Sequence, residues 1–258
     1  MFERIEVIGE GRVGAAVSAR LRERGIAVGG DGAEIVLLCV PDRAISDVAR
    51  EVMSRKHVSQ EMSHHHMSAG LTPGHGREGH GAEGHVWLGH VSGAVPLSAL
   101  DPSERRFGVH PLQTFARPEG RAPETLAGQF DGAWAAVSGE SAEALAVAAW
   151  LAKTLGLRPF ELAESARPLY HAGAAIASNY LVTLQRAAAS LFEAAGAPPE
   201  ALVPLMLRTI ENGFELTGPI ARGDWETVQR HRDAIAAARP ELEHLYETLA
   251  SATVAIAL

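Results

Sequence analysis

The stretch VIGEGRVGAAV, residues 7–17, decides the fold of this 258-residue chain. Gly9, Gly11 and Gly14 fit the pattern G-x-G-x-x-G, which here follows a strand-like apolar segment and opens a helical one. In that context the first glycine permits a tight turn, the second lets a phosphate group approach the backbone, and the third lets helix and strand pack closely. The stretch therefore predicts the phosphate-binding turn of a Rossmann-type α/β sheet.

Strand and helix patterns alternate after this turn. Strands are expected over 5–9, 34–40, 85–95, 106–112, 132–139 and 158–163, and helices over 12–24, 43–53 and 141–155. Such alternation is typical of a doubly wound parallel sheet.

A full dinucleotide fold has a further strand after the first helix, here ending near Val28, and its link to the strand over 34–40 is unusually short. Only six residues lie between Val28 and Ile35, whereas parallel neighbours joined by a helix need about a dozen or more. An extended link of this length reaches about 23–25 Å, enough to cross two strand spacings of about 10 Å in total. We therefore predict that the side of the sheet beyond the first strand, the flank that binds adenosine, is contracted and binds adenosine poorly. Asp31 nevertheless lies where a ribose-binding acid is expected.

The sequence changes character after about residue 164. Residues 167–196 predict one long Ala-rich helix that ends at Gly196, followed by helices over 198–212, 224–238 and 240–255. Because the long helix is apolar nearly all round, we expect it to be buried and to form a subunit interface. The chain is thus predicted to hold an α/β domain over 1–164 and an all-helical domain over 165–258.

Residues 54–84 fit neither domain. Gly-His recurs with a period of five at 74–75, 79–80, 84–85 and 89–90, and this low complexity predicts a flexible insertion. Neutral imidazoles bind nickel, zinc or copper ions, which makes His75, His80 and His85 the candidate metal ligands. The repeat implies no fixed ligand geometry, so a solvated loop is the favoured interpretation.

Composition narrows the classes of partner. A formal net charge of −8 argues against nucleic acid and anionic membranes, which require a basic face. No apolar run approaches the length of about 18 residues that a membrane span needs. The single cysteine, Cys39, lies in an apolar run and predicts a buried thiol in a cytoplasmic protein.

Ligands of open α/β sheets bind beyond the carboxyl ends of the strands. His110 follows such an end and is the candidate acid or base, because imidazole titrates near neutrality; a structural histidine is the alternative. Ser92 is expected either to orient a substrate hydroxyl or to close a turn. The predicted cofactor contacts are Gly9, Gly11, Arg12, Val13, Gly14, Cys39, Val40, Pro41, Ser92 and Gly93.

Polar residues in the helical part form a second set. His171, Ser178 and Asn179 fall on one face of the long expected helix, and buried polar groups there either satisfy one another or meet a ligand. Arg222 carries the guanidinium fork that binds carboxylates, and Asp224 is the expected N-cap of the next helix. Asn179 is expected to orient the reacting oxygen, and the predicted substrate contacts are Gln113, His171, Thr217, Arg222 and Asp224.

Six motifs together resemble one bacterial family. They are GEGRVG at 9–14, LLCVPD at 37–42, GHVSGA at 89–94, VHPLQTF at 109–115, YHAGAAIASNYLVTL at 170–184 and LTGPIARGD at 216–224. That family has a Rossmann-like domain and a helical domain of unknown function, in a branch of the 6-phosphogluconate dehydrogenase superfamily. Its relatives include prephenate dehydrogenases, pyrroline-carboxylate reductases and deazaflavin-dependent NADP oxidoreductases. The resemblance implies NADP in the N-terminal cleft, a homodimer built through the helical domain, and proton transfer by His110.

Two functions remain open. The first is an NAD(P)-dependent oxidoreductase acting on a small carboxylate-bearing substrate, in which His110 exchanges the proton and Arg222 holds the carboxylate. The second is a catalytically silent nucleotide- or metal-binding or sensing protein, which the contracted flank favours. No residue near Asp31 decides between NAD and NADP.

Overall fold

The computed structural model describes residues 2–55, 86–115 and 122–257. Contacts divide the chain into two compact units, Met1–Ala174 and Ala175–Leu258. The first unit extends ten residues past the predicted domain boundary at 164, because Arg167 is buried against its sheet.

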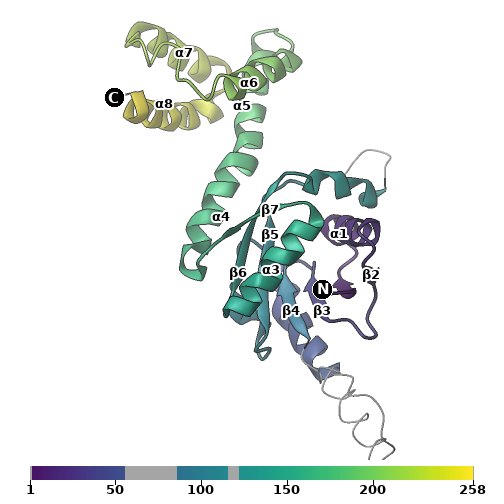
Figure 1. Cartoon of the computed structure of the whole chain (residues 1–258). Helices are drawn as coiled ribbons and strands as arrows, with labels where there is room; N and C mark the ends of the chain where they lie inside the picture. Colours follow the sequence, from purple (N-terminus) through teal and green to yellow (C-terminus); the bar gives the residue numbers. More distant parts are fainter. Residues whose placement is uncertain (1, 56–85, 116–121, 258) are drawn as a thin grey trace, which may run out of the picture. The chain divides into compact units, whose positions relative to one another are not determined.

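Within the described residues, the first unit holds a seven-stranded sheet in the order β2-β1-β3-β4-β5-β6-β7 (Figure 1). The strands are β1 (Arg4–Ile8), β2 (Ala27–Val28), β3 (Ile35–Leu38), β4 (Trp87–His90), β5 (Arg106–Pro111), β6 (Trp134–Gly139) and β7 (Arg158–Glu161). The predicted fold class, a Rossmann-like α/β sheet followed by an all-α part, is confirmed.

One pairing corrects the prediction of a wholly parallel sheet. Strands β5 and β6 run antiparallel, with His110 opposite Ala136, whereas the other neighbouring strands are parallel. The described part of the connection between them holds the 3-10 segment η3 (Pro123–Phe130). Antiparallel neighbours need no helical crossover, so the strand pattern alone did not reveal the direction of β6.

Helices cover both faces of the sheet. They are α1 (Arg12–Glu23), a helix over 45–55 after the 3-10 turn η1 (Asp42–Ala44), and α3 (Ala142–Leu155); η2 (Leu97–Leu100) is a further 3-10 segment. Ile35 and Leu37 of β3 belong to one apolar cluster, and Val36 and Leu38 to the other. Because both faces of β3 are buried, the strand reads as a continuous apolar run.

Local signals set the ends of α3. The hydroxyl of Ser141 accepts a hydrogen bond from the Ala144 N–H at 3.1 Å and caps the helix start. Gly156 ends the helix with φ +94°, a left-handed conformation that favours glycine.

The flank beside β1 is contracted, as predicted. β2 and β3 lie on opposite sides of β1, and the link between them contains turns and no helix. Gly29 N–H donates to the Ile5 carbonyl, and Glu34 N–H to that of Arg4. β2 ends level with Ile5 while β1 continues to Ile8, a shortfall of about 10 Å.

The second unit is helical. The 3-10 turn η4 (Glu164–Ala166) and α4 (Arg167–Ala175) close the first unit, and the helical stretch continues in the second unit through η5 (Ile176–Tyr180) to α5 (Leu181–Ala194). The second unit then holds α6 (Leu202–Glu211), α7 (Trp225–Ala238) and α8 (Glu243–Ala257), with 3-10 turns η6 (Pro199–Ala201) and η7 (Pro240–Leu242). The η5 segment is π-helical. The expectation that His171, Ser178 and Asn179 share a face assumed unbroken α-helical spacing, which a π turn does not keep.

The expected burial of the long helix is wrong for the single chain. No residue of α5 is buried, and Leu202, Val228 and Ile235 are the buried apolar residues described in the second unit. A helix that is apolar on all sides needs neighbours on all sides, and this unit covers only part of its surface. Among the helices described here, none combines the length and apolar character that crossing a membrane requires.

Candidate functional site

The register of the sheet brings the predicted strand-end residues to one edge. Ile8, Leu38, His90 and Gly108 stand side by side across β1, β3, β4 and β5. These four strands are parallel, so the glycine turn and the residues after β3 and β4 meet at their carboxyl ends together with His110. This is the edge where ligands of open α/β sheets bind.

The three glycines of the first turn have different surroundings. A Cβ on Gly9, where φ is +120°, would lie 2.4 Å from the carbonyl oxygen of Cys39. A Cβ on Gly14 would lie 1.8 Å from the carbonyl oxygen of Gly9. In contrast, a Cβ on Gly11 would meet no described heavy atom within 4 Å. Gly9 and Gly14 therefore shape the turn, whereas the space over Gly11 is open to a ligand.

The first turn of α1 offers backbone donors beside that space. Ala15 N–H bonds to the Gly11 carbonyl at 2.9 Å, so the amides of Arg12, Val13 and Gly14 precede the intrahelical ladder. No side chain caps this helix start, and its first turn carries no acid. Free amides and the positive end of the helix dipole favour an anion, so these residues fit a diphosphate.

The turns after β3 and β4, which border the glycine turn, are held by burial and by hydrogen bonds. Cys39 is buried, which raises the pKa of its thiol to about 12, so this side chain is a neutral packing group, as its apolar run predicts. Ser92 Oγ accepts hydrogen bonds from Ala94 N–H and Val95 N–H, each at 3.1 Å. The turn-closing alternative for Ser92 is thus what its contacts support. Val40 and Pro41 continue the chain from Cys39 into η1.

His110 is paired with a tyrosine. Its Nδ1 lies 2.7 Å from the hydroxyl oxygen of Tyr170, and the two rings meet edge to face with centroids 5.6 Å apart. The imidazole also lies against Gly93, where a Cβ would come within 2.7–2.9 Å of Cε1, Nε2 and Nδ1. The ring of His171 is 6.2 Å away. Strand β5 and helix α4 together fix this side chain.

The surroundings keep His110 uncharged. Burial, helped by His171 and Arg167 and opposed by Asp42, lowers the pKa of His110 to about 4. Burial likewise lowers the pKa of His90 to about 4. In this chain alone, His110 at neutral pH is therefore an imidazole and not an imidazolium.

A buried arginine ties three segments together near His110. Arg167 donates to the Ser92 carbonyl at 3.2 Å, to Ser138 Oγ at 2.7 Å, and from Nε to Glu164 Oε1 at 3.1 Å. Glu164 Oε2 accepts Leu97 N–H at 2.8 Å. Burial alone would raise the pKa of Glu164, but these hydrogen bonds and the Arg167 charge hold it below its ordinary value. The network fixes the turn after β4.

Sequence reasoning missed Tyr170, Arg167 and His90. Tyr170 adjoins the predicted His171, but its partner is 60 residues away, a separation at which periodicity carries no information. His90 Nδ1 accepts Ser92 N–H at 3.2 Å, and its Nε2 is buried without a hydrogen-bond partner in the described structure.

The remaining predicted residues are spread over both units. In the first unit, Gln113 is exposed and its side-chain nitrogen donates to the Gln129 carbonyl at 3.2 Å. In the second unit, Asn179 lies in η5, while Thr217 and Arg222 are exposed between α6 and α7. Asp224 accepts Thr227 N–H at 3.1 Å and caps α7, as predicted.

The histidine repeat gives no structural test of a metal site. His75, His80 and His85, with most of the insertion at 54–84, lie outside the described residues. Among the residues that are described, no group of three or more His, Cys, Asp or Glu is arranged to hold a metal ion.

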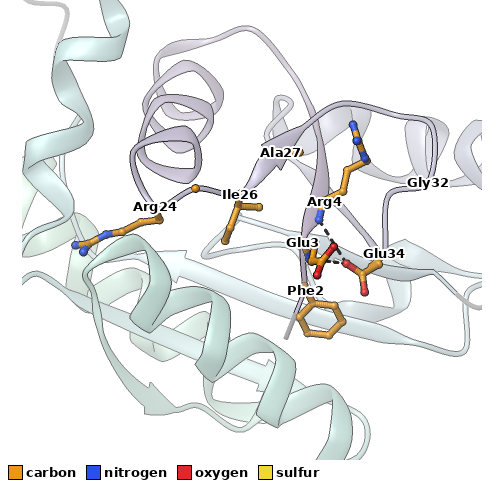
Figure 2. A pocket seen from close by; sticks show the side chains of 9 residues that line it. Phe2, Glu3, Arg4, Arg24, Ile26, Ala27, Gly32 and Glu34 are labelled. Atoms are coloured by element: carbon orange, nitrogen blue, oxygen red, sulfur yellow. Dashed lines mark hydrogen bonds between the residues drawn. The ribbon is translucent and has the colours of Figure 1, made fainter.

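An open pocket of about 690 Å³ lies at the opposite edge of the sheet, where β1, β2 and β3 begin. Figure 2 shows Phe2, Arg24 and Glu34 among its lining side chains. The Glu34 carboxylate accepts the backbone N–H of Glu3 at 2.6 Å and that of Arg4 at 3.4 Å. This carboxylate therefore links the residue before β3 to the beginning of β1, at the edge of the sheet away from the glycine turn.

Comparison with solved structures identifies the fold. A proposed NADP oxidoreductase from Bacteroides fragilis is 18% identical, with 98% of each chain covered and a TM-score of 0.70. A protein from Thermotoga maritima is 20% identical, with the same coverage and a TM-score of 0.68. Pyrroline carboxylate reductase from Plasmodium falciparum, solved with NADP bound, is 12% identical over 99% of this chain and 95% of that chain, with a TM-score of 0.52.

Sequence comparison finds one family model that matches part of the chain, and it assigns no activity. No curated protein matches the chain. The 6-phosphogluconate dehydrogenase superfamily stays a prediction. Residues 133–253 match the family model of DUF2520, a domain of unknown function. The match begins just before β6 and ends within α8.

Proposed function

We propose that this chain is a nicotinamide-dependent oxidoreductase acting on a small carboxylate-bearing substrate. The observation that carries the proposal is the open space over Gly11 beside the uncapped amides of Arg12, Val13 and Gly14. A diphosphate requires both features. The similarity in fold to a proposed NADP oxidoreductase and to a reductase solved with NADP adds support.

In this proposal the carboxyl edge of the sheet binds the coenzyme and carries His110. The amides of α1 hold the diphosphate, and the turns at Cys39–Pro41 and Ser92–Gly93 border the nicotinamide. When bound, the coenzyme supplies or receives a hydride. His110 interacts with the reacting heteroatom at this edge. In the helical unit, Asn179 is the proposed residue for orienting that atom, and the guanidinium fork of Arg222 is the proposed partner of the carboxylate. Gln113, His171, Thr217 and Asp224 are the further substrate contacts proposed.

We propose NADP as the coenzyme, in the cytoplasm, with its adenosine end poorly supported. β2 consists of Ala27 and Val28 and stops short of the glycine turn. Affinity therefore has to come mainly from the diphosphate and the nicotinamide.

We further propose a homodimer built through the helical unit. Val203, Leu207 and Ile210 of α6 follow helical spacing and are all exposed. Leu181, Val182 and Leu184 of α5 are exposed as well. A second copy that covered these side chains would remove a large apolar surface from water.

A binding experiment with the wild type and two variants tests the coenzyme site. NADPH at 100 times its dissociation constant should stabilise the native protein by about 2.7 kcal/mol in thermal unfolding. Gly11→Ala should keep the fold, because Gly11 has an ordinary φ of −68° and open space around it, yet should abolish the response because its methyl group occupies the phosphate position. Gly128→Ala, also in open space, is the control and should respond fully. A wild type without a response, or a fully responding Gly11→Ala, refutes the proposal.

The short β2 favours a second candidate, a protein that binds nucleotide or metal without turnover. It predicts NADPH binding with no reduction of any carbonyl or imine, or stabilisation by nickel alone that deletion of residues 62–85 removes.

A further inference from the structure

The contact between His110 and Tyr170 indicates whether the candidate site reduces or oxidises its substrate. This inference rests on the proposed function above. We propose that Tyr170 is a positioning residue: its hydroxyl donates to Nδ1 of His110 and thereby keeps the imidazole proton on Nε2, which serves as a neutral donor to a carbonyl oxygen or imine nitrogen. This arrangement favours reduction of the substrate over oxidation.

Packing holds the pair in one geometry. The 2.7 Å separation is that of a good hydrogen bond. Phe160 of β7 meets the Tyr170 ring with centroids 5.9 Å apart, and Gly93 leaves room for the imidazole only because it has no Cβ. Strands β5 and β7, helix α4 and the turn after β4 thus converge on one contact.

The direction of this hydrogen bond follows from counting donors and acceptors. Tyr170 has one O–H, and His110 Nδ1 is its partner in the described structure. If Nδ1 carried the proton instead, the tyrosine hydrogen would need a second acceptor in a half-buried position, at a cost. A tyrosine that donates satisfies both atoms with one bond and leaves Nε2–H for a ligand.

Burial keeps both partners neutral. His171, Arg167 and Asp42 are the titratable or charged groups acting on His110; burial, helped by His171 and Arg167 and opposed by Asp42, lowers the pKa of His110 to about 4. Burial raises the pKa of Tyr170 to about 12 against the influence of Arg167. At neutral pH the pair therefore shares one hydrogen between two uncharged groups.

The consequence is electrostatic. A fixed Nε2–H aimed at a carbonyl or imine stabilises the negative charge that develops on the heteroatom as hydride from the nicotinamide adds to its carbon, and solvent water supplies the proton that the heteroatom then takes up. An alcohol to be oxidised needs an acceptor for its proton, and with this tautomer Nε2 is a donor. The site is thus arranged for a carbonyl or imine substrate.

Nitrogen spectra of the full-length protein labelled with ¹⁵N-histidine test the tautomer at pH 7, with His110→Gln to assign the signals. The wild type should show Nε2 protonated and Nδ1 as a hydrogen-bonded acceptor. Tyr170→Phe keeps the ring but removes the donor, so the Nδ1 signal should move toward that of a protonated nitrogen as the second tautomer becomes populated. Tyr246→Phe removes a similar phenol, 2.9 Å from His231 in the second unit, and should leave the His110 signals unchanged.

Protonation of Nδ1 in the wild type, or an unchanged Nδ1 signal in Tyr170→Phe, overturns the proposal. On a reducible substrate with NADPH, Tyr170→Phe should lower kcat about tenfold with little change in KM, about 1.4 kcal/mol of transition-state stabilisation; an unchanged kcat also overturns it. The spectra need neither coenzyme nor substrate. A wild type that carries the proton on Nδ1 but still binds NADPH refutes the positioning role alone, whereas a wild type that does not bind NADPH refutes the proposed function.

Discussion

The two compact units differ in how far their apolar side chains are buried. In the first unit, Leu37 and Leu151 are completely buried in a sheet covered on both faces. In the second unit, Leu207 and Phe214 are 55% and 71% exposed. Each exposed apolar Å² forgoes about 25 cal/mol of stabilisation. The first unit thus builds its core within one chain, whereas the apolar helices of the second unit lack a covering surface, which we propose a second copy supplies.

The largest expected effect tests how tightly the first unit is built. Gly14→Ala places a Cβ 1.8 Å from the Gly9 carbonyl oxygen, a backbone atom that has little room to move. We expect a loss of about 4 kcal/mol or more in the free energy of unfolding by urea. Gly11→Ala, in open space, should keep the wild-type midpoint; similar midpoints for both variants would show that the turn is loose.

A smaller effect compares one leucine from each unit. Leu151→Ala should cost about 2–5 kcal/mol because it leaves a cavity in a packed core. Leu207→Ala should cost less than about 0.5 kcal/mol in dilute protein, where its side chain is exposed. At concentrations where the proposed homodimer forms, Leu207→Ala should also weaken association, measured by sedimentation. Wild-type protein that stays monomeric at all concentrations contradicts the homodimer.

The last comparison uses pH. Among the described residues, the two histidines with lowered pKa values, His90 and His110, lie in the first unit. Both bind a proton more readily when unfolded, so their contribution is complete above pH 6.5 and is lost as pH falls toward about 4. Each should cost about 1.4 kcal/mol per pH unit in that window.

Urea unfolding between pH 7 and pH 4.5 measures this slope. His90→Asn, whose side-chain oxygen can still accept Ser92 N–H, should unfold with a shallower pH dependence than the wild type. An equal slope in both proteins would mean that His90 is accessible to protons in the native state.

Local and distant information explain what the sequence could predict. The strand over Ile35–Leu38 was predictable because its apolar run is a local property. The short link after Val28 was predictable from the reach of six residues. The antiparallel β6 depends on the pairing of Phe107 with Gly139, which no local pattern records.

The candidate site divides in the same way. The glycine turn and His110 were predictable as local motifs beside strand ends. The contact of His110 with Tyr170 joins segments far apart in the chain, and the π-helical turn at Ile176–Tyr180 interrupts a sequence that fits a regular helix. Both arise from tertiary packing, which single-sequence patterns do not encode.

The brevity of β2 also protects the sheet from unwanted growth. An edge strand of two residues exposes almost no backbone for a foreign strand to pair with. The opposite border, β7, carries Pro159, which has no N–H to donate, between the charged ends Arg158 and Glu161. Both borders are therefore poor templates for amyloid-like stacking.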